Sequence, residues 1–314
     1  MIRIGVIGVG SLGKHHARIY DAMRHVDLTC IVDTDIAAAK KIGKKYKAEY
    51  FKNYHGIVEK VDAVSIAAPT PFHYEIAKFF LEHKIHVLVE KPITVSVEEA
   101  DDLILLAEKN KVILQVGHIE RFNPAVVEAQ KHIKDARFIE INRLGPYSPR
   151  CSNVGVVLDL MVHDLDMVLF LTDSKPVSID AVGASVMSQT EDIANVRIRF
   201  KNSCVANISA SRVSLERFRK FRIFQHDSYL SLDYEKQSLK MYSKREGVEK
   251  IETLKDILFM KIPIKKEEPL YLELKDFIEC IEQNTFPKVS GVHGRDALKL
   301  ALDITEQIRQ FSSK

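Results

Sequence analysis

The chain has 314 residues, of which 46% are hydrophobic and 28% charged, with 46 lysines and arginines against 43 aspartates and glutamates. This composition excludes a collagenous, disordered or disulfide-stapled chain, because apolar side chains are ample for a core and no residue type dominates. The length predicts about two domains. A formal net charge of +3 is too small for the electrostatic footprint of a dedicated nucleic-acid binder.

The four cysteines lie far apart, without a C-x-x-C pair or a Cys/His cluster at zinc spacing. We therefore expect reduced thiols, a cytoplasmic location and no metal site. No signal peptide is expected, because Met1 is followed almost at once by an apolar run without separate charged and apolar regions. The most apolar segment, residues 154–171, contains three aspartates and a histidine and is too polar for a membrane span.

Short β-branched runs alternate with amphipathic stretches over the first third of the chain. Buried parallel strands are predicted at residues 2–7, 28–32, 63–67, 85–89 and 112–116. Helices are predicted at residues 12–22, 36–46, 74–82 and 97–110. Strand and helix alternation of this kind predicts right-handed βαβ units and a doubly wound sheet.

The pattern changes after about residue 120. One helix is predicted at 154–171, followed by strands at 177–187, 196–200, 204–213, 218–224, 229–232 and 239–242. Two helices are predicted at 270–283 and 294–311, and the charged stretch 261–268 is interpreted as a solvated connector. Successive strands without intervening helices predict a largely antiparallel sheet.

The predicted fold class is therefore α/β, with two domains. Residues 1–118 are expected to form a Rossmann domain with a doubly wound parallel sheet. Residues 119–291 are expected to form an α+β domain on a large, mostly antiparallel open sheet. The C-terminal helix, residues 292–314, is expected to pack back on the first domain.

A glycine-rich motif, G-V-G-S-L-G at residues 8–13, follows the first predicted strand and opens the first predicted helix. In a dinucleotide site Gly8 makes the tight turn, Gly10 lets the backbone approach a pyrophosphate, and Gly13 brings helix and sheet together. The helix N-terminus supplies N–H groups to the anion. The alternative is an ordinary glycine turn before a helix. The residues predicted to bind the cofactor here are Gly8, Gly10, Ser11, Leu12 and Gly13.

Asp33 ends the second predicted strand, where a carboxylate accepts hydrogen bonds from the adenosine ribose hydroxyls. That carboxylate would repel a 2′-phosphate and no arginine stands nearby, so the sequence favours NAD over NADP. The next predicted strand ends in a turn of small residues at the same carboxyl edge, where ligands bind in such sheets. Further cofactor contacts are expected there from Ala68, Pro69, Thr70 and His73.

The fourth predicted strand ends in Glu90 and Lys91, so a charged pair reaches the same edge and is expected to contact the cofactor. A lysine at that position can also donate to a substrate oxygen. The alternative is a solvated surface lysine.

Asp159 and His163 are four residues apart in a stretch of helical periodicity. This spacing predicts that both lie on one face of an α-helix, one turn apart. Since imidazole titrates near working pH, such a pair can remove the proton of an alcohol while a cofactor takes the hydride. The alternative is a buried histidine satisfied by a neighbouring aspartate.

Two further patterns carry less weight. Residues 217–222, R-F-R-K-F-R, interleave basic and aromatic side chains as single-strand nucleic-acid binders do. A sheet strand with outward-facing charges is the favoured interpretation in a near-neutral chain. Asp164 and Asp166 form a D-x-D pattern, and we expect Asp166 to face solvent or a helix partner.

In combination, these motifs resemble those of the Gfo/Idh/MocA oxidoreductases, which act on sugars, inositols and related polyols. The resemblance spans nearly the whole chain. Its elements in chain order are the glycine loop, Asp33, E-K-P at 90–92, G-H-I-E-R-F-N-P at 117–124, D-x-x-x-H at 159–163 and P-K-V-S-G at 287–291.

The resemblance implies an NAD-dependent enzyme in which His163 accepts the proton, Asp159 is its partner and Lys91 assists. Arg121 matches an arginine close to the cofactor and substrate. Within the family, residues 117–124 and 159–166 look most like the nucleotide-sugar branch, the UDP-N-acetylglucosamine 3-dehydrogenases, whose 3-keto product passes to an aminotransferase. The resemblance further implies a homodimer or homotetramer. The alternatives are a dehydrogenase of a free sugar or inositol and a non-catalytic NAD-binding sensor.

Overall fold

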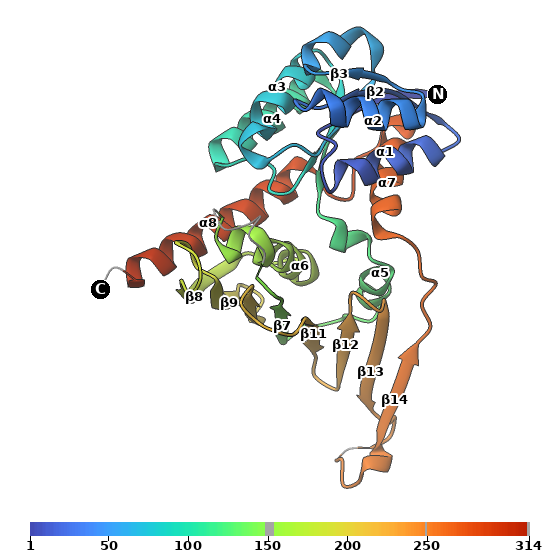
Figure 1. Ribbon diagram of the computed structural model, residues 1–314. Coiled ribbons are helices and arrows are strands. Elements are labelled where there is room, and N and C mark those ends of the chain that lie inside the picture. The colour runs from blue at the N-terminus through green and yellow to red at the C-terminus, as the bar shows by residue number, and fades with distance from the viewer. Residues whose placement is uncertain (148–153, 249, 313–314) are drawn as a thin grey trace. The chain divides into compact units, whose positions relative to one another are not determined.

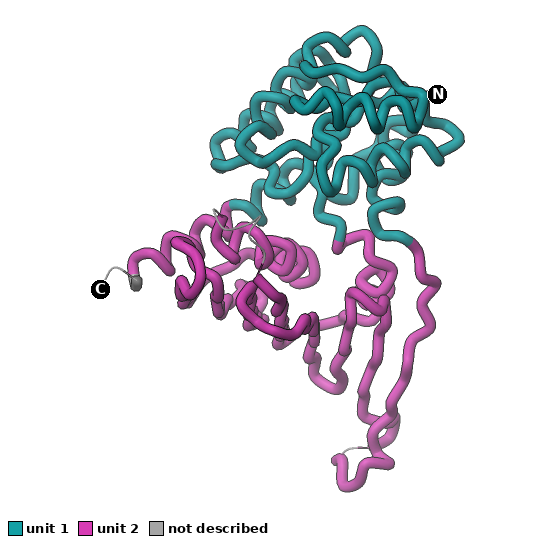
Figure 2. Tube along the Cα trace, in the orientation of Figure 1, with its two compact units in different colours: residues 1–119, 268–298 teal, residues 120–267, 299–314 magenta. Residues whose placement is uncertain are grey.

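The computed structural model describes residues 1–147, 154–248 and 250–312. The chain divides into two compact units (Figure 2). Unit 1 comprises Met1–Ile119 and Glu268–Leu298, and unit 2 comprises Glu120–Glu267 and Lys299–Lys314. Among the described residues, every helix is too short or too polar to span a bilayer.

Unit 1 is built on a six-stranded sheet in the order β3-β2-β1-β4-β5-β6, and all its strand pairs are parallel (Figure 1). The order reverses between β1 and β4, as in a doubly wound nucleotide-binding sheet. The strands are β1 (Ile2–Ile7), β2 (Val26–Val32), β3 (Glu49–Phe51), β4 (Ala63–Ile66), β5 (His86–Glu90) and β6 (Leu114–Gly117). The five predicted strands are confirmed, and β3 escaped prediction because its three residues include no buried side chain.

The helices of unit 1 form two groups, and the helices within each group contact one another. The first contains α1 (Gly13–Ala22), α2 (Ile36–Tyr46) and α7 (Pro269–Gln283), and the second contains α3 (His73–Glu82) and α4 (Val97–Asn110). Sequence sets their starts, since the side chains of Asp35 and Ser96 accept backbone hydrogen bonds at the N-termini of α2 and α4. Helix α7, far along the chain, joins this core through Leu274 and Phe277, both fully buried.

Unit 2 is built on an eight-stranded sheet in the order β14-β13-β12-β11-β7-β10-β9-β8. Only the β10 and β7 pair is parallel among the strands described. The strands are β7 (Phe138–Leu144), β8 (Pro176–Ala184), β9 (Ile193–Phe200), β10 (Val205–Ser211), β11 (Phe218–Phe224), β12 (Ser228–Asp233), β13 (Ser238–Lys244) and β14 (Ile257–Ile262). The predicted fold class is confirmed, and residues 218–222 of the R-F-R-K-F-R stretch form the start of β11.

The helices of unit 2 are α5 (Pro124–Gln130), a π-helix (Val157–Met161), α6 (Val162–Thr172) and the second part of α8 (Gly291–Ser312). In β9 every second residue is buried, so one face of the sheet packs inward and the other is exposed. Helix α5 contacts β12 and β13, and the π-helix contacts β10.

The structure corrects two predictions in unit 2 and adds a strand that was not predicted. Residues 157–161 form a π-helix, whose i→i+5 bonding cannot be read from apolar periodicity. The start of the expected connector, residues 261–262, belongs to β14. Strand β7 was not predicted, although its buried and half-buried residues alternate regularly.

Replacing Phe277 with alanine tests whether the packing of α7 stabilises the core of unit 1. We expect Phe277→Ala to lower the free energy of unfolding by about 3–5 kcal/mol, because it leaves a cavity in a close-packed core. Phe286 lies in the same unit and is 97% exposed, so Phe286→Ala is the matched control and should change little. Urea denaturation followed by circular dichroism measures both, and equal effects would contradict the packing described here.

Candidate active site

The glycine loop of unit 1 has a backbone geometry that requires glycine at two of its positions. Gly8 has φ +82°, a conformation that side chains rarely adopt. A Cβ on Gly13 would lie 1.8 Å from the carbonyl oxygen of Gly8, so α1 can start this close to the loop only with glycine. A Cβ on Gly10 would meet nothing within 4 Å. The protein itself therefore leaves open the space in front of Gly10.

Asp33 fixes this loop to the end of β2. One carboxylate oxygen accepts a hydrogen bond from the Val9 N–H at 2.8 Å, and the other accepts from the Asp35 N–H at 2.9 Å. The Gly8 N–H also donates to the Val32 carbonyl at 2.8 Å. The predicted ribose acceptor is thus held in one orientation, half-buried beside the glycine loop.

The turn after β4 is held by His73. Its Nε2 lies 2.7 Å from the Ala68 carbonyl oxygen and its Nδ1 lies 2.8 Å from the Pro92 carbonyl oxygen. Burial lowers the pKa of His73, although both carbonyl contacts act in the opposite direction. The side chain therefore ties the turn at Ala68 to Pro92, which follows Lys91, and brings two strand ends together. Pro69 and Thr70 lie in the turn between Ala68 and His73.

Glu90 links Lys91 to helix α1. The Glu90 carboxylate is almost fully buried, with Oε1 3.1 Å from His16 Nε2 and Oε2 accepting the Lys91 N–H at 3.3 Å. His16 is completely buried on α1, and its Nδ1 lies 2.7 Å from the Ser65 hydroxyl. This role of His16 was not predicted from the sequence. Its position one turn into the helix after the glycine loop was the available signal.

Asp159 and His163 lie in unit 2, and both are half-buried. Asp159 is part of the π-helix and His163 is the second residue of α6, so the predicted single α-helical turn between them is wrong. The two remain close along the same helical segment. Short π-helices of this kind occur frequently at functional sites.

Two buried carboxylates follow His163 on α6. Asp166 is fully buried and receives three hydrogen bonds from the Arg121 guanidinium, at 2.6, 2.8 and 3.1 Å. The Arg121 Cζ also lies 4.6 Å from the centre of the Phe170 ring. Of the two predicted surroundings of Asp166, solvent is wrong, because the side chain is buried, and its partner is Arg121 in the short 3-10 helix Ile119–Phe122. The structure gives Arg121 this positioning contact in addition to its predicted role at the cofactor.

Asp164 has an equivalent partner. The Arg143 guanidinium donates to both of its oxygens at 2.7 Å, and Glu120 lies 3.3 Å from the same guanidinium. Burial disfavours the charge on Arg143, but Asp164 and Glu120 outweigh it and raise the pKa of Arg143 above its ordinary value. Tyr234 packs against this guanidinium and is fully buried, which raises the pKa of its hydroxyl.

A third buried pair, Asp192 and Arg212, contacts the residues that precede the π-helix. Arg212 Nε donates to Asp192 at 2.7 Å, and the same guanidinium donates to the carbonyl of Val154. Next to it, the Val156 N–H donates to the Glu191 carbonyl at 2.9 Å, and a Cβ on Gly155 would lie 1.9 Å from the Glu191 carboxylate. Glu191, Asp192 and Arg212 therefore fix the start of the segment that carries Asp159. None of these contacts was predicted from the sequence.

Among the described residues, no three His, Cys, Asp or Glu side chains are grouped so that they could hold a metal ion. The residues of unit 1 can bind an anion at the glycine loop, and the residues Asp159 and His163 of unit 2 can take part in proton transfer.

Comparison with known proteins decides the family. Residues 2–118 match the Gfo/Idh/MocA oxidoreductase family with its NAD-binding Rossmann fold, and residues 138–228 match the C-terminal domain of the same family. The UDP-N-acetylglucosamine 3-dehydrogenase of Acidithiobacillus ferrooxidans is 35% identical over 99% of this chain and 98% of its own. The chain belongs to the Gfo/Idh/MocA oxidoreductase family. It is an NAD-binding enzyme of that family.

Solved structures of relatives agree with this assignment. A structure of the Acidithiobacillus ferrooxidans enzyme matches with a TM-score of 0.94, 34% identity and coverage of 100% of this chain and 99% of that one. The inositol 2-dehydrogenase of Rhizobium meliloti is 27% identical over 96% of this chain and 94% of its own. A levoglucosan dehydrogenase structure, at 19% identity and a TM-score of 0.86, shares the fold.

The glycine loop offers a test in which protein and cofactor effects separate. We expect Gly10→Ala to leave stability unchanged, because no protein atom meets the new Cβ, yet to weaken NAD binding by about tenfold or more by intruding on the pyrophosphate. Gly13→Ala should weaken both, because its Cβ collides with Gly8. Thermal unfolding and calorimetric titration with NAD measure the two properties. Unchanged NAD affinity in Gly10→Ala would contradict the assigned binding position.

The Asp192–Arg212 pair predicts acid sensitivity. Hydrogen bonds from backbone N–H groups and from Arg212 overcome burial and hold the pKa of Asp192 below its ordinary value. Its stabilisation is therefore complete above the ordinary carboxylate range and is lost as pH falls through the folded pKa. We expect Asp192→Asn to lower the free energy of unfolding by about 3–5 kcal/mol at pH 7, because Arg212 is left without its counter-charge.

The loss in Asp192→Asn should shrink below about pH 4, where the unfolded aspartate is protonated. Asp180→Asn, at an exposed position on β8, is the control and should change stability little. Denaturant titrations at pH 7 and at acidic pH make the comparison. A pH-independent difference would contradict the charge argument.

Proposed function

We propose that the protein oxidises the C3 hydroxyl of UDP-N-acetylglucosamine to a 3-keto sugar, with NAD as hydride acceptor. The observation that carries this proposal is the 35% identity over nearly the whole length to a UDP-N-acetylglucosamine 3-dehydrogenase. Lys91, Asp159 and His163 are present in the positions that the family motifs occupy, which supports a working catalytic set. Transfer of the ketone to an aminotransferase would follow from the chemistry of that product.

The residues of unit 1 would hold the cofactor. Backbone N–H groups at residues 8–13 would bind the pyrophosphate, Asp33 the ribose hydroxyls, and the turns at 68–73 and 90–91 the remainder. The open space at Gly10 fits a pyrophosphate at this position. When bound, NAD accepts a hydride from the carbinol carbon.

The proton of the hydroxyl would pass to His163. Imidazole is suited to this because its ordinary pKa lies near working pH, and Asp159 would orient it and balance the positive charge it gains. Lys91 would donate a hydrogen bond to the same oxygen, which stabilises the developing alkoxide. Since Arg143 and Arg121 already pair with Asp164 and Asp166, these two carboxylates do not compete for the proton.

We further propose that unit 1 is the cofactor domain and unit 2 the substrate and oligomer domain, in a cytoplasmic homodimer or homotetramer. The exposed face of the eight-stranded sheet supports the oligomer role, because every second residue of β9 is exposed there. The predicted division near residue 119 remains part of this proposal, as does the return of residues 292–298 to the first domain, whereas the predicted return of the later residues does not, because Lys299–Lys314 belong to unit 2.

A second candidate is oxidation of a free inositol or sugar. The likeness to inositol dehydrogenases, at 27% identity over 96% of the chain, favours it. NAD reduction followed by absorbance with UDP-N-acetylglucosamine and with a panel of inositols and free sugars separates the candidates. A ketone trap is included so that an equilibrium toward the alcohol does not hide the activity. Activity with the panel alone would contradict the nucleotide-sugar proposal.

We expect His163→Ala and Lys91→Ala each to reduce kcat by about 10²–10⁴, because each removes a proton-transfer or hydrogen-bonding partner of the reacting oxygen. NAD affinity should remain near that of the unaltered protein in His163→Ala. His226→Ala, at a side chain 85% exposed, is the matched histidine control. Unaltered rates in both active-site variants would show that His163 and Lys91 serve the fold alone.

A further inference from the structure

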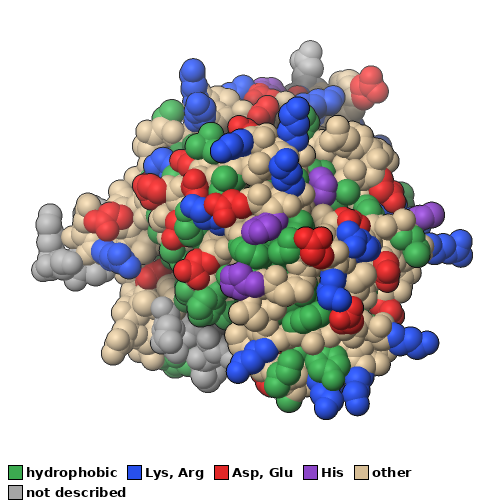
Figure 3. Space-filling model, turned by 90° about the horizontal axis from the view of Figure 1, so that it is seen from above, with side chains coloured by type: hydrophobic (Ala, Val, Ile, Leu, Met, Phe, Trp, Pro, Cys, Tyr) green, Lys and Arg blue, Asp and Glu red, His purple; other side chains and the backbone are tan. Residues whose placement is uncertain are grey.

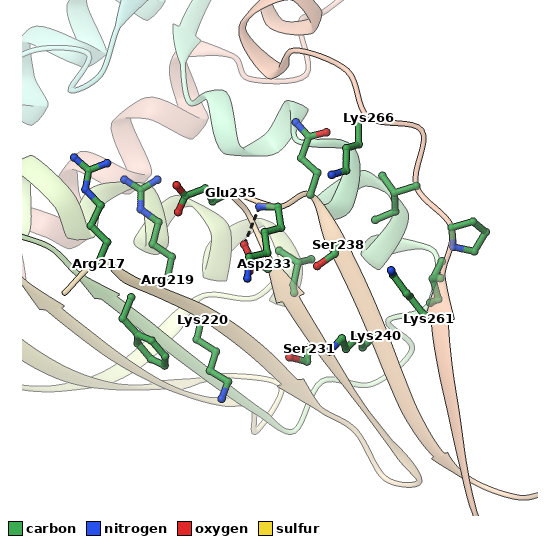
Figure 4. A pocket seen from close by; sticks show the side chains of 17 residues that line it. Arg217, Arg219, Lys220, Ser231, Asp233, Glu235, Ser238, Lys240, Lys261 and Lys266 are labelled. Atoms are coloured by element: carbon green, nitrogen blue, oxygen red, sulfur yellow. Dashed lines mark hydrogen bonds and ion pairs between the residues drawn. The ribbon is translucent and has the colours of Figure 1, made fainter.

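The charged side chains of this protein differ in what they cost the fold. In a groove of about 1020 Å³ on unit 2, Lys240 on β13 stands directly opposite Lys261 on β14 (Figure 4). Both lysines are exposed, on the face of the sheet that the proposed oligomer role already uses. Exposed charges of both signs also lie on the molecular face seen in Figure 3. Charges of this kind keep their hydration, so they cost little and need no buried partner.

Glu90 is in the opposite situation, because its carboxylate is almost fully buried in unit 1. A buried carboxylate is strongly destabilising unless a polar or charged group compensates it. His16 on α1 supplies such a group, with Nε2 3.1 Å from Glu90 Oε1, within ion-pair distance but without the alignment of a hydrogen bond. His16 is itself completely buried, so it does not meet a substrate directly. The protein therefore buries two ionisable groups together at the end of β5.

Two other ionisable groups near this carboxylate do not balance its charge. Burial raises the pKa of the Tyr20 hydroxyl on α1. The negative charges of Glu273 and Glu90 raise that pKa further, so Tyr20 remains neutral. For His73, burial lowers the pKa and outweighs the opposite effect of Glu90. The contact with His16 is therefore a compensation that neither of these groups replaces.

The Glu90 carboxylate is fixed by contacts on three sides. Its Oε2 accepts a hydrogen bond from the Lys91 N–H at 3.3 Å. Gly117 stands opposite Glu90 in the pairing of β5 with β6, and a Cβ at position 117 would lie 2.8 Å from Oε2. On the side of α1, the His16 ring is held by its Nδ1 contact with the Ser65 hydroxyl at 2.7 Å. A chain of contacts thus runs from β4 through α1 to the backbone of Lys91.

This chain of contacts places Lys91 relative to the glycine loop. Helix α1 begins at Gly13, the last residue of the loop, and His16 lies one turn into the helix. After Lys91, the Pro92 carbonyl oxygen lies 2.8 Å from His73 Nδ1, so the backbone is held on both sides of the lysine. A lysine side chain is flexible, and a displacement of about 1 Å in a reacting group can lower a rate about 10²-fold. The position of the Lys91 backbone therefore decides where its ammonium group can reach.

We infer that His16 is a positioning residue, which acts through Glu90 to hold the backbone of Lys91 in place relative to the glycine loop. This inference rests on the proposed function, which gives Lys91 its catalytic role. His16 acts through another residue, since its burial keeps it away from the reacting atoms. Loss of its contact with Glu90 should therefore lower kcat and leave KM nearly unchanged, as for an interaction that matters in the transition state.

Two variants of His16 separate its two contacts. Glutamine can reach Glu90 from the place of Nε2 but not Ser65, whereas asparagine can reach Ser65 from the place of Nδ1 but not Glu90. At saturating NAD, we expect His16→Gln to keep kcat within about threefold and His16→Asn to lower it about tenfold, with KM within about twofold in both. Thermal unfolding should fall similarly in the two variants, because each loses one buried contact. An equal loss of kcat in both would overturn the inference.

Gly117→Ala reaches the same carboxylate from the opposite side. Its Cβ would lie 2.8 Å from Glu90 Oε2, so the carboxylate must move and kcat should again fall about tenfold. The protein should remain folded, because the atom that gives way is the end of a side chain. The matched control is Gly5→Ala in β1, whose Cβ would meet the end of a side chain at 3.0 Å and should leave kcat within about twofold. The double variant His16→Asn/Gly117→Ala should be little slower than either single variant, because both act through Glu90.

A measurement without turnover separates this inference from the proposed function. Acetylation of Lys91 by acetic anhydride is followed by mass spectrometry on the full-length protein, with the exposed Lys40 as internal standard. Lys91 should react about threefold faster in His16→Asn and in Gly117→Ala than in the unaltered protein, because a released backbone opens more often.

The outcomes are distinct. If the unaltered protein oxidises neither UDP-N-acetylglucosamine nor the panel, the proposed function fails and the acetylation rates still decide the inference. If it does oxidise a substrate, and His16→Asn and Gly117→Ala keep the unaltered kcat, the inference is overturned and the catalytic role of Lys91 stands. Equal acetylation of Lys91 in all variants would overturn the inference in either case.

Discussion

The arrangement of unit 2 depends on the neutralisation of two aspartates on one helix. Asp164 and Asp166 are both fully buried on α6, and a buried carboxylate without a partner is strongly destabilising. Each meets an arginine from a different segment, Arg143 on β7 and Arg121 in the turn after β6. Helix α6 can therefore take its place only when the sheet and that turn are formed. His163 precedes both aspartates and inherits this fixed position.

Unit 1 uses the same principle with fewer charges. Buried His16 lies between Ser65 on β4 and Glu90 at the end of β5, and so joins the helix of the glycine loop to the strand that ends before Lys91. His73 makes the corresponding link between the ends of β4 and β5 through two carbonyl groups. Asp33, His73 and Glu90, three of the residues predicted to meet the cofactor in this unit, are therefore held by polar contacts that cross from one strand, helix or loop to another.

Sequence alone predicted the elements whose signal is local. Strand β1, helix α2 and helix α4 were placed at their observed bounds, because apolar runs and helical periodicity are visible over a few residues. The buried pairs were not predictable in this way. Arg121 and Asp166 are 45 positions apart, and only the folded sheet brings them together. The π-helix was missed because apolar spacing does not distinguish i→i+4 from i→i+5 bonding.

Charge shows the same difference between sequence and structure. The small net charge argues against a general polyanion binder, but it averages over a groove in which two lysines face each other across adjacent strands. That placement arises because antiparallel pairing puts Lys240 opposite Lys261, 21 positions later, and the turn between β12 and β13 adds Lys236.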